Sequence, residues 1–397
     1  MGRKIPMLGS GFIGRFYADS LHGLRSSDRI VSVYSRKEEG AKKFAEDYQV
    51  VHWTTDMEAS INKPEVNVVI IALPNNLHEA AVIACAKAGK GVLCTKPLGR
   101  NALEAKRMLE IVEDAGIFHG YLEDLCFTPK FLKTMSSIQQ GNLGRILWAR
   151  SRETHPGPHS DWFWNIEESG GGAILDLACH CIEVTRNYIG KDIRPLEVIC
   201  WADTQVKPIE AEDHAIGMVR YENGAVGQFE VSWTFRGGLD LRDEVMGTEG
   251  TVWINNFLRT GLEMFISGKG SNYVAEKAES TSGWIFPVGD EVHELGYDHM
   301  FANMFNAMDN NAIPSETFYD GYIVNAVMDA ALRSVKTKKW EPIDLELWRG
   351  KKNSQKTLEL TDYDEQYFLI KEETIHDGRN KLILKDKKSG KVIERVS

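Results

Sequence analysis

Three ionisable residues, Asp176, His180 and Glu183, lie within an otherwise apolar segment, residues 170–183 (GGGAILDLACHCIE). In an α-helix, spacings of four and then three residues place their side chains on one face. Imidazole titrates close to neutral pH, and an adjacent carboxylate can fix its tautomer and stabilise the protonated ring. We therefore expect His180 to be a proton-transfer group with Asp176 as its partner, the alternative being a buried structural histidine.

A glycine-rich loop follows the first predicted strand. Gly9, Gly11 and Gly14 in LGSGFIG have the G-x-G-x-x-G spacing at a strand-to-helix turn. The first glycine permits a tight turn, the second lets a pyrophosphate approach the backbone, and the third allows close packing of helix and strand. The loop therefore predicts a dinucleotide site that includes Phe12 and Ile13, the alternative being a glycine turn without a ligand.

The second predicted strand ends at Ser35 and Arg36. An acidic residue near this point holds the ribose 2′-hydroxyl in NAD sites, whereas a hydroxyl and a guanidinium suit a 2′-phosphate better. We expect NAD(P) as cofactor and favour NADP, although an ordinary surface arginine also explains Arg36.

Two patterns of secondary structure divide the chain. Short β-rich runs alternate with amphipathic helical patterns at first, which is typical of a doubly wound parallel sheet, although Pro6 removes a donor from a strand that should be central. Longer strands joined by tight turns follow, with the Asn-Gly hairpin signal in ENG. We predict a dinucleotide-binding domain over residues 1–122, a substrate-binding α/β domain over 123–343, with helices near 173–189, 299–309 and 318–337, and an extension over 344–397 with a β-hairpin turn at Gly390.

Composition excludes several classes of partner. The chain of 397 residues has a formal net charge of −10 and therefore no basic surface for nucleic acid or anionic membranes. It has no apolar targeting segment and no run approaching ~18 apolar residues. Its six cysteines are sparse, as in a reducing compartment. We expect a cytoplasmic protein that binds a small molecule.

Three further segments carry a resemblance. ALPNNLH (72–78), TKPLGR (95–100) and residues 170–183, together with the phosphate loop, resemble the motifs of the Gfo/Idh/MocA oxidoreductase family over residues 4–343. The resemblance implies a Rossmann domain followed by an α/β domain with a large, mostly antiparallel open sheet. It also implies homo-oligomers, dimers or tetramers, packed through that sheet.

The resemblance extends to single residues of the cofactor site. Pro74, Asn75 and His78 match the family's cofactor-contacting loop, and Lys96 and Pro97 match its Glu-Lys-Pro motif. These five residues are therefore expected to bind cofactor.

The catalytic motifs match with two departures. Asp176 and His180 match the family's D-x-x-x-H pair, but Thr95 replaces the usual glutamate before the lysine and Glu183 replaces the usual aspartate. The first departure removes the expected partner of Lys96.

Oxidation of a secondary alcohol requires hydride transfer to nicotinamide and removal of the hydroxyl proton. We expect His180 to be the base and Lys96, with a pKa lowered by partial burial and the pyridinium charge, to polarise the oxygen. The two roles are interchangeable on sequence alone.

The segment 153–172 is predicted to be a loop, because its Gly and Pro residues argue against regular structure. A loop at this place could bind substrate through its aromatic and polar side chains. Its Trp162, Phe163 and Trp164 suit stacking on a sugar ring, or alternatively fasten the loop to the core. Its polar residues Glu153, His155, His159 and Asp161 suit hydrogen bonds to hydroxyls. The predicted substrate-binding residues are Lys96, Glu123, His155, Trp162, Trp164, Asp176 and His180.

A metal site is a further alternative. Glu123, Glu153, His155 and His180 are suitable oxygen and nitrogen donors, but no spacing brings them together. The Cys-His-Cys alternation at 179–181 lacks the spacing of zinc sites. We predict no metal.

We therefore expect an NAD(P)-dependent oxidoreductase that transfers a hydride between nicotinamide and a secondary hydroxyl of a sugar, glycoside or cyclic polyol. One alternative is glycoside cleavage through transient oxidation by a tightly bound NAD(H). A second is a non-enzymatic ligand sensor, which would have no need for Lys96, Asp176 and His180 together.

Overall fold

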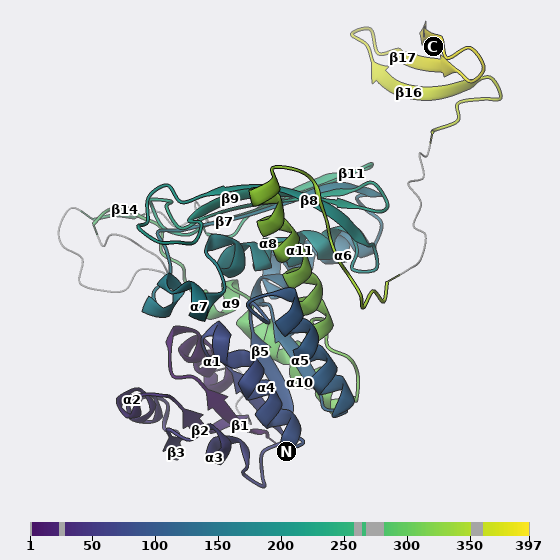
Figure 1. The fold of residues 1–397 in the computed structure, drawn as a ribbon. Coiled ribbons are helices and arrows are strands. Elements are labelled where there is room, and N and C mark those ends of the chain that lie inside the picture. Colours follow the sequence, from purple (N-terminus) through teal and green to yellow (C-terminus); the bar gives the residue numbers. More distant parts are fainter. Residues whose placement is uncertain (1, 24–27, 258–263, 267–281, 351–359, 397) are drawn as a thin grey trace. The chain divides into compact units, whose positions relative to one another are not determined.

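Two compact units make up the computed structural model, residues 1–352 and 353–397 (Figure 1). The structure describes residues 2–23, 28–257, 264–266, 282–350 and 360–396. The first unit contains both predicted large sheets, and the second contains a small sheet of its own.

The first large sheet has six parallel strands in the order β3-β2-β1-β4-β5-β6. This is the Rossmann order, and it confirms the predicted doubly wound fold. The short strand β3 was not predicted. The strands are β1 (Lys4–Leu8), β2 (Arg29–Tyr34), β3 (His52–Thr54), β4 (Val68–Ile71), β5 (Gly91–Thr95) and β6 (His119–Leu122).

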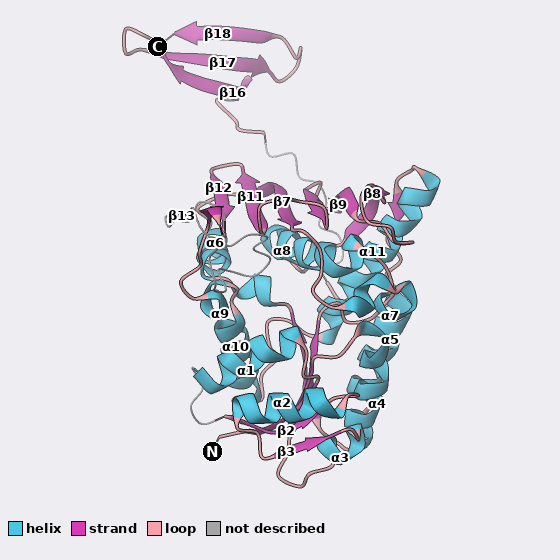
Figure 2. Ribbon diagram, turned by 90° about the vertical axis from the view of Figure 1, so that its left-hand side faces the viewer, coloured by secondary structure: helices cyan, strands magenta, loops and turns pink. Residues whose placement is uncertain are grey.

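Helices cover both faces of this sheet (Figure 2). Strand β4 (VVII) is therefore buried along its whole length, as in other two-sided parallel sheets. Helix α1 packs against α10, while α4 packs against α5, which also contacts α11. The helices are α1 (Phe12–Gly23), α2 (Glu38–Tyr48), α3 (Met57–Ile61), α4 (His78–Lys87), α5 (Ala102–Asp114), α9 (Glu291–Glu294), α10 (Tyr297–Asp309) and α11 (Phe318–Thr337).

Pro6 does lie in the central strand β1. The pairing of β1 with β2 shifts register between Ile5 and Pro6, and β1 pairs with β4 only at Met7 and Leu8. The irregular pairing lets the strand accommodate a residue without a backbone donor.

The second large sheet has the order β12-β11-β7-β10-β9-β8-β15. Only β7 and β10 are parallel, so the sheet is mostly antiparallel, as the resemblance implied. Helices α8 (Cys179–Ile189) and α11 pack on one face. The strands are β7 (Ile146–Thr154), β8 (Pro195–Asp203), β9 (His214–Tyr221), β10 (Val226–Ser232), β11 (Asp240–Gly247), β12 (Thr251–Asn255) and β15 (Glu341–Pro342); outside it lie α6 (Pro129–Gln139) and the pair β13 (Met264–Ile266) and β14 (Gly283–Ile285).

The second unit is a three-stranded antiparallel sheet of β16 (Tyr367–Thr374), β17 (Asn380–Asp386) and β18 (Val392–Val396). Gly390 has a φ of 74° between β17 and β18, which confirms the predicted hairpin turn. The first strand, β16, was not predicted.

In the part of the chain that the structure describes, no helix combines the length and the apolar composition needed to cross a membrane.

Candidate active site

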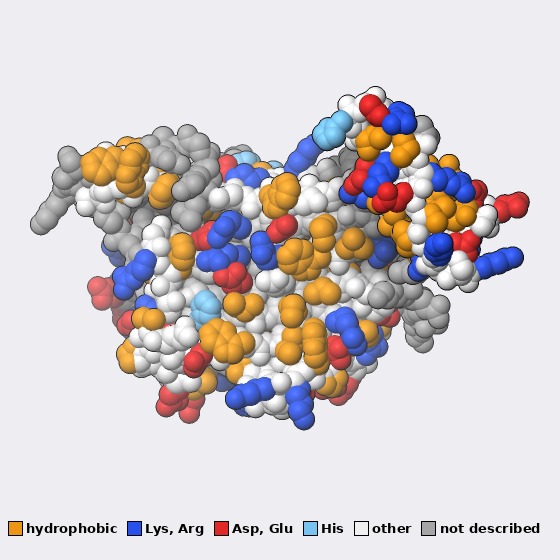
Figure 3. Space-filling model, turned by 90° about the horizontal axis from the view of Figure 1, so that it is seen from above, with side chains coloured by type: hydrophobic (Ala, Val, Ile, Leu, Met, Phe, Trp, Pro, Cys, Tyr) orange, Lys and Arg blue, Asp and Glu red, His pale blue; other side chains and the backbone are white. Residues whose placement is uncertain are grey.

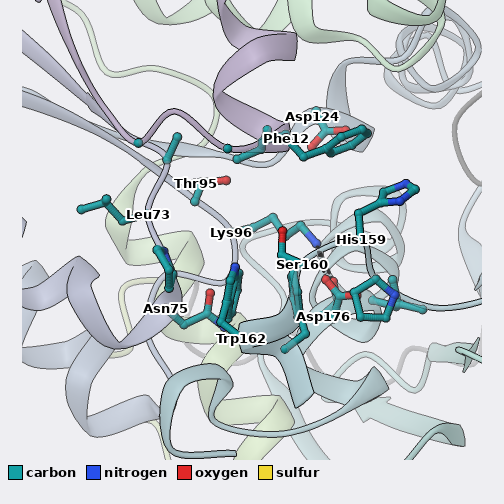
Figure 4. A pocket seen from close by; sticks show the side chains of 18 of the residues that line it. Phe12, Leu73, Asn75, Thr95, Lys96, Asp124, His159, Ser160, Trp162 and Asp176 are labelled. Atoms are coloured by element: carbon teal, nitrogen blue, oxygen red, sulfur yellow. Dashed lines mark hydrogen bonds and ion pairs between the residues drawn. The ribbon is translucent and has the colours of Figure 1, made fainter. Parts of the chain in front are cut away.

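A cavity of about 340 Å³ lies at the carboxyl ends of the Rossmann strands (Figure 4). The loops after β1 and β4 line it, which is the point where the strand order reverses and where such sheets bind ligands. Residues of the second sheet and its loops line the other side. One cavity therefore holds residues of both predicted sites.

The phosphate loop fits a dinucleotide. Gly9 has a φ of 120°, and a Cβ there would lie 2.1 Å from the Ala72 carbonyl oxygen. A Cβ at Gly14 would lie 2.7 Å from the Gly9 oxygen. Gly11 lines the cavity, and a Cβ there would have no described atom within 4 Å. Close packing of the backbone thus explains why glycine occupies positions 9 and 14, whereas the need for space for a ligand best explains the glycine at position 11.

Most of the predicted cofactor-binding residues line the cavity, but three do not. Gly14 packs inside the turn, and Pro97 is buried. His78 is fully buried, with its ring nitrogens 2.9 Å from the Leu73 oxygen and 3.1 Å from the Leu98 oxygen. These residues shape the loops rather than line the cavity. Those that line it are Gly9, Gly11, Phe12, Ile13, Ser35, Arg36, Pro74, Asn75 and Lys96.

Lys96 follows β5 and points toward Asp176 (Figure 4). Its Nζ donates to Asp176 Oδ1 at 3.0 Å and to the Asp176 carbonyl oxygen at 2.6 Å. The other carboxylate oxygen of Asp176 accepts a hydrogen bond from Trp233 Nε1 at 3.0 Å. Asp176 therefore supplies the partner that the Thr95 substitution removes, and the Thr95 hydroxyl instead lies 2.8 Å from the Tyr17 hydroxyl.

The predicted low pKa of Lys96 is wrong. Burial acts to lower this pKa, but the carboxylate of Asp176 and other nearby acids outweigh it and raise the pKa well above its usual value. Lys96 is therefore a permanent ammonium group, which can donate hydrogen bonds to an oxygen but cannot accept a proton.

His180 has a different carboxylate partner from the one predicted. Its Nδ1 is hydrogen-bonded to Oε1 of Glu123, which follows β6 and is 0% exposed. Burial, together with the charge of Lys96, lowers the pKa of His180 to about 3. Glu123 is thus placed behind His180 rather than in the cavity, so its predicted direct contact with substrate is not supported.

A π-helix explains the changed pairing. Residues Ile174–Ala178 (η4) are a π-helix that continues into α8, so Asp176 and His180 are not related by an α-helical turn. Both still line the cavity. Glu183 does not; its carboxylate binds Arg186 at 2.7 Å in a separate buried network.

The segment 153–172 is only partly irregular. It contains the 3₁₀-helix Asp161–Trp164 (η3) and the helix α7 (Ile166–Ser169), neither of which was predicted. Trp162 and Phe163 stack with ring centroids 3.8 Å apart and line the cavity. Trp164 instead packs edge-on against Trp233 and is not among the residues that line the cavity, so its contact with substrate stays a prediction.

Polar residues of this segment also reach the cavity. Glu153, His155 and His159 line it, and the ring of His159 lies 4.6 Å from that of Phe12 in the phosphate loop. The segment therefore joins the second domain to the cofactor side of the cavity.

The donors of the metal alternative are only partly brought together. Ligand atoms of Glu123, Cys179 and His180 lie within 4.8 Å of one another. However, Glu123 and His180 are hydrogen-bonded to each other, and Cys179 Sγ donates a hydrogen bond to the backbone carbonyl oxygen of Asp176 at 3.2 Å. Hydrogen bonds among the protein groups account for this arrangement.

The sequence did not predict Asp124, Trp233 or Tyr297. Asp124 and Tyr297 line the cavity, and Asp124 directly follows Glu123 after a parallel strand, which was a usable signal. Trp233 follows β10 in an ordinary strand pattern, so nothing local marked it.

The Rossmann sheet, phosphate loop and ammonium–imidazole site define a nucleotide-dependent oxidoreductase. Residues 3–120 match the family model described as "Oxidoreductase family, NAD-binding Rossmann fold", and residues 131–253 match "GFO/IDH/MocA C-terminal domain". The chain belongs to the Gfo/Idh/MocA family of oxidoreductases.

Several relatives are dehydrogenases or reductases. Levoglucosan dehydrogenase of Pseudarthrobacter phenanthrenivorans is 29% identical over 72% of this chain and 82% of its own length. Myo-inositol 2-dehydrogenase of Thermotoga maritima is 28% identical, over 65% and 76%. The 1,5-anhydro-D-fructose reductase of Ensifer adhaerens is 30% identical, over 56% and 67%.

Solved structures share the fold. GenD2 from gentamicin A biosynthesis, in complex with NAD, has a TM-score of 0.81 and 26% identity over 87% of this chain and 97% of its own. Levoglucosan dehydrogenase with NADH and levoglucosan has a TM-score of 0.74 and 25% identity, over 87% and 100%.

Proposed function

We propose that this protein is an NAD(P)-dependent dehydrogenase or reductase acting on a secondary hydroxyl of a sugar, glycoside or cyclic polyol. The observation that carries the proposal is the presence of Lys96, Asp176 and His180 in the same cavity as the phosphate loop. Relatives named for a sugar substrate and for an inositol support the substrate class.

Each residue has a distinct part in the proposed reaction. When bound, the nicotinamide accepts or donates the hydride. Lys96, held by Asp176, donates a hydrogen bond to the reacting oxygen and stabilises negative charge as it develops. His180 takes the hydroxyl proton during oxidation and returns it during reduction. Trp162 and Phe163 offer an apolar surface to a sugar ring.

For the cofactor, we propose a preference for NADP. Ser35, Arg36 and Lys37 all line the cavity beyond β2, and a guanidinium nitrogen of Arg36 lies 3.8 Å from a carboxylate oxygen of Glu168. A phosphate would therefore gain charge-assisted hydrogen bonds there. Arg36→Ala should raise the KM for NADP⁺ by ~10-fold and leave that for NAD⁺ unchanged. A wild-type preference for NAD⁺ would contradict this assignment.

The experiment that tests the function follows the near-ultraviolet absorbance of reduced cofactor. Purified protein is given NADP⁺ or NAD⁺ with a panel of sugars, glycosides and inositols. Growing absorbance with one class supports net dehydrogenation. Consumption of a glycoside without net reduction of cofactor would contradict it.

We also propose that the chain forms homo-oligomers, dimers or tetramers, through the outer face of the second sheet. Hydrophobic side chains gather there among charged ones (Figure 3). Trp201, Ile216, Met218 and Met246 are each at least 38% exposed on this face. Light scattering would show a monomer if the proposal is wrong.

A cytoplasmic location is part of the proposal, because all six cysteines are free thiols. Unpaired buried thiols suit a reducing compartment.

A further inference from the structure

The hydrogen bond between His180 and Glu123 joins two elements that the family motifs do not connect. Glu123 lies between β6 and the 3₁₀-helix Asp124–Phe127 (η2), whereas His180 lies on α8. The carboxylate of Glu123 has no exposure to solvent, and its Oε1 is hydrogen-bonded to Nδ1 of His180. Both carboxylate oxygens of Asp176 already accept hydrogen bonds, from Lys96 and Trp233, whereas Nδ1 of His180 is bonded to Glu123.

We propose that Glu123 is a positioning residue that makes His180 an effective base, by holding the proton on Nδ1 so that Nε2 accepts the proton of the substrate hydroxyl. This proposal rests on the proposed function. A carboxylate behind an imidazole fixes the tautomer and stabilises the imidazolium that forms, as in other acid–base pairs.

The protons and electrons of the step balance within the site. In oxidation, the substrate O–H bond breaks and its proton moves to Nε2 of His180, which gives an imidazolium whose Nδ1 proton stays hydrogen-bonded to Oε1 of Glu123. The electron pair of the O–H bond becomes the second carbon–oxygen bond, as the C–H pair leaves as hydride to the nicotinamide. Reduction of the carbonyl reverses each transfer.

The pair has one protonation state that suits oxidation. If Glu123 is protonated, it donates to Nδ1, and Nε2 must carry the ring proton, so the pair cannot accept another. If Glu123 is ionised, Nδ1 carries the proton and Nε2 is open. Burial, opposed by Lys96, raises the pKa of Glu123 to about 8. The rate of oxidation should therefore rise with pH, with a midpoint near that value.

Neighbouring groups with shifted pKa values must be distinguished from Glu123 in this titration. The pKa of Lys96 is raised well above its usual value, and burial raises the pKa of Glu153 well above its usual value. Asp124 is the competing candidate, because burial raises its pKa to about 7. The ionisable groups that face the pair are Lys96, Tyr121, Asp124, Cys126, Glu153, Asp176, Cys179 and Glu183.

The test measures kcat/KM for oxidation against pH in the full-length enzyme and in Glu123→Gln. The amide oxygen can still accept from Nδ1, so this variant keeps the shape of the site but removes the charge. We expect kcat/KM to fall by ~100-fold and the alkaline rise to disappear. Glu123→Asp should restore the rise at a lower rate, because it restores the charge on a shorter side chain.

Two further variants separate chemistry from structure. Glu316→Gln changes another buried glutamate that is bonded to Asn187 and Lys191, and it should leave the midpoint unchanged. If the rise persists in Glu123→Gln but disappears in Asp124→Asn, then Asp124 is the titrating group and the proposal is wrong. A purely structural role for Glu123 would lower the rate without moving the midpoint.

A spectroscopic measurement keeps the test independent of turnover. The downfield Nδ1 proton of His180, assigned by its loss in His180→Ala, should titrate with the midpoint of Glu123 and move upfield in Glu123→Gln. Absence of this resonance in the wild type would overturn the proposal. If the resonance behaves as expected but no secondary hydroxyl is oxidised, the pairing stands and the proposed function fails.

Discussion

Helix α8 contributes to two buried groups of charged residues that differ in how their charge is balanced. The support cluster, beside α11, consists of Glu183, Arg186, Lys191, Glu316 and Asp320, and the cavity cluster consists of Lys96, Glu123, Glu153, Asp176 and His180. In the support cluster, Arg186 Nη1 contacts Glu183 and Asp320, and Lys191 Nζ lies 2.9 Å from Asp320 and 3.0 Å from Glu316. Each cation thus meets at least two carboxylates.

Both clusters contain three carboxylates, but the support cluster has two permanent cations and the cavity cluster has one. Lys96 is its one permanent cation and binds Asp176, whereas Glu153 Oε2 accepts no hydrogen bond from any residue that the structure describes. Asp320 and Glu123 illustrate the difference, whereas burial and the charge of Glu183 raise the pKa of Glu316 in the support cluster well above its usual value. Burial acts to raise the pKa of Asp320, but Lys191 and Arg186 hold it at about 2, while burial raises the pKa of Glu123 to about 8.

The difference distinguishes buried charges that stabilise the fold from buried charges that take part in the reaction. Largely compensated charge, with two cations among three carboxylates, joins α8 to α11 and needs no ligand. Unbalanced charge costs stability, and its presence beside a cavity indicates a site that exchanges protons with a substrate. Substitutions in the cavity cluster should therefore lower activity more than stability, and substitutions in the support cluster should lower stability more than activity.

The largest effect is expected for His180→Ala in the cavity cluster. Loss of the base should lower kcat for oxidation by ~10²- to 10⁴-fold, because proton transfer then depends on water. Cofactor affinity should be retained, since the phosphate loop is unchanged. Steady-state kinetics with a fluorescence titration of cofactor would check both. A variant with the wild-type rate and normal cofactor binding would remove His180 from the mechanism.

The opposite profile is expected for Arg186→Met in the support cluster. Removal of the guanidinium leaves Glu183 and Asp320 with less compensation, which should lower the free energy of unfolding by ~3–5 kcal/mol. The activity of the molecules that remain folded should change little. Urea unfolding monitored by tryptophan fluorescence would measure the loss. The double variant Arg186→Met, Glu183→Gln should recover part of it, and no recovery would show that packing rather than charge is lost.

Local patterns were sufficient to predict the sheets and the backbone of the site. Gly9 could be predicted because a tight turn depends on its own conformation and on one adjacent strand. Lys96 and His180 could be placed in the site because each occupies a short motif on a predicted element. Both large sheets followed from strand patterns and the resemblance.

Side-chain partners could not be predicted in the same way. Glu123 and His180 are 57 residues apart in sequence, as are Asp176 and Trp233. An α-helical periodicity placed Asp176 beside His180, but the π-helix Ile174–Ala178 changes the angular relation, and no local residue marks it. Whether His180 pairs with Asp176 or with Glu123 therefore depends on contacts between residues that are distant in sequence.

The smallest effect is expected for Trp233→Phe, which tests how firmly the cavity cluster is held. The change removes the Nε1 donor to Asp176 Oδ2 and keeps most of a fully buried ring. Because one hydrogen bond to a charged group is lost, kcat should fall by ~10-fold while the KM for cofactor stays the same. The matched control is Trp340→Phe, outside the cavity, where the side chain is 40% exposed and kcat should be unchanged. Equal effects of the two substitutions would mean that Asp176 is positioned by Lys96 alone, and the cavity cluster would then depend on a single ion pair.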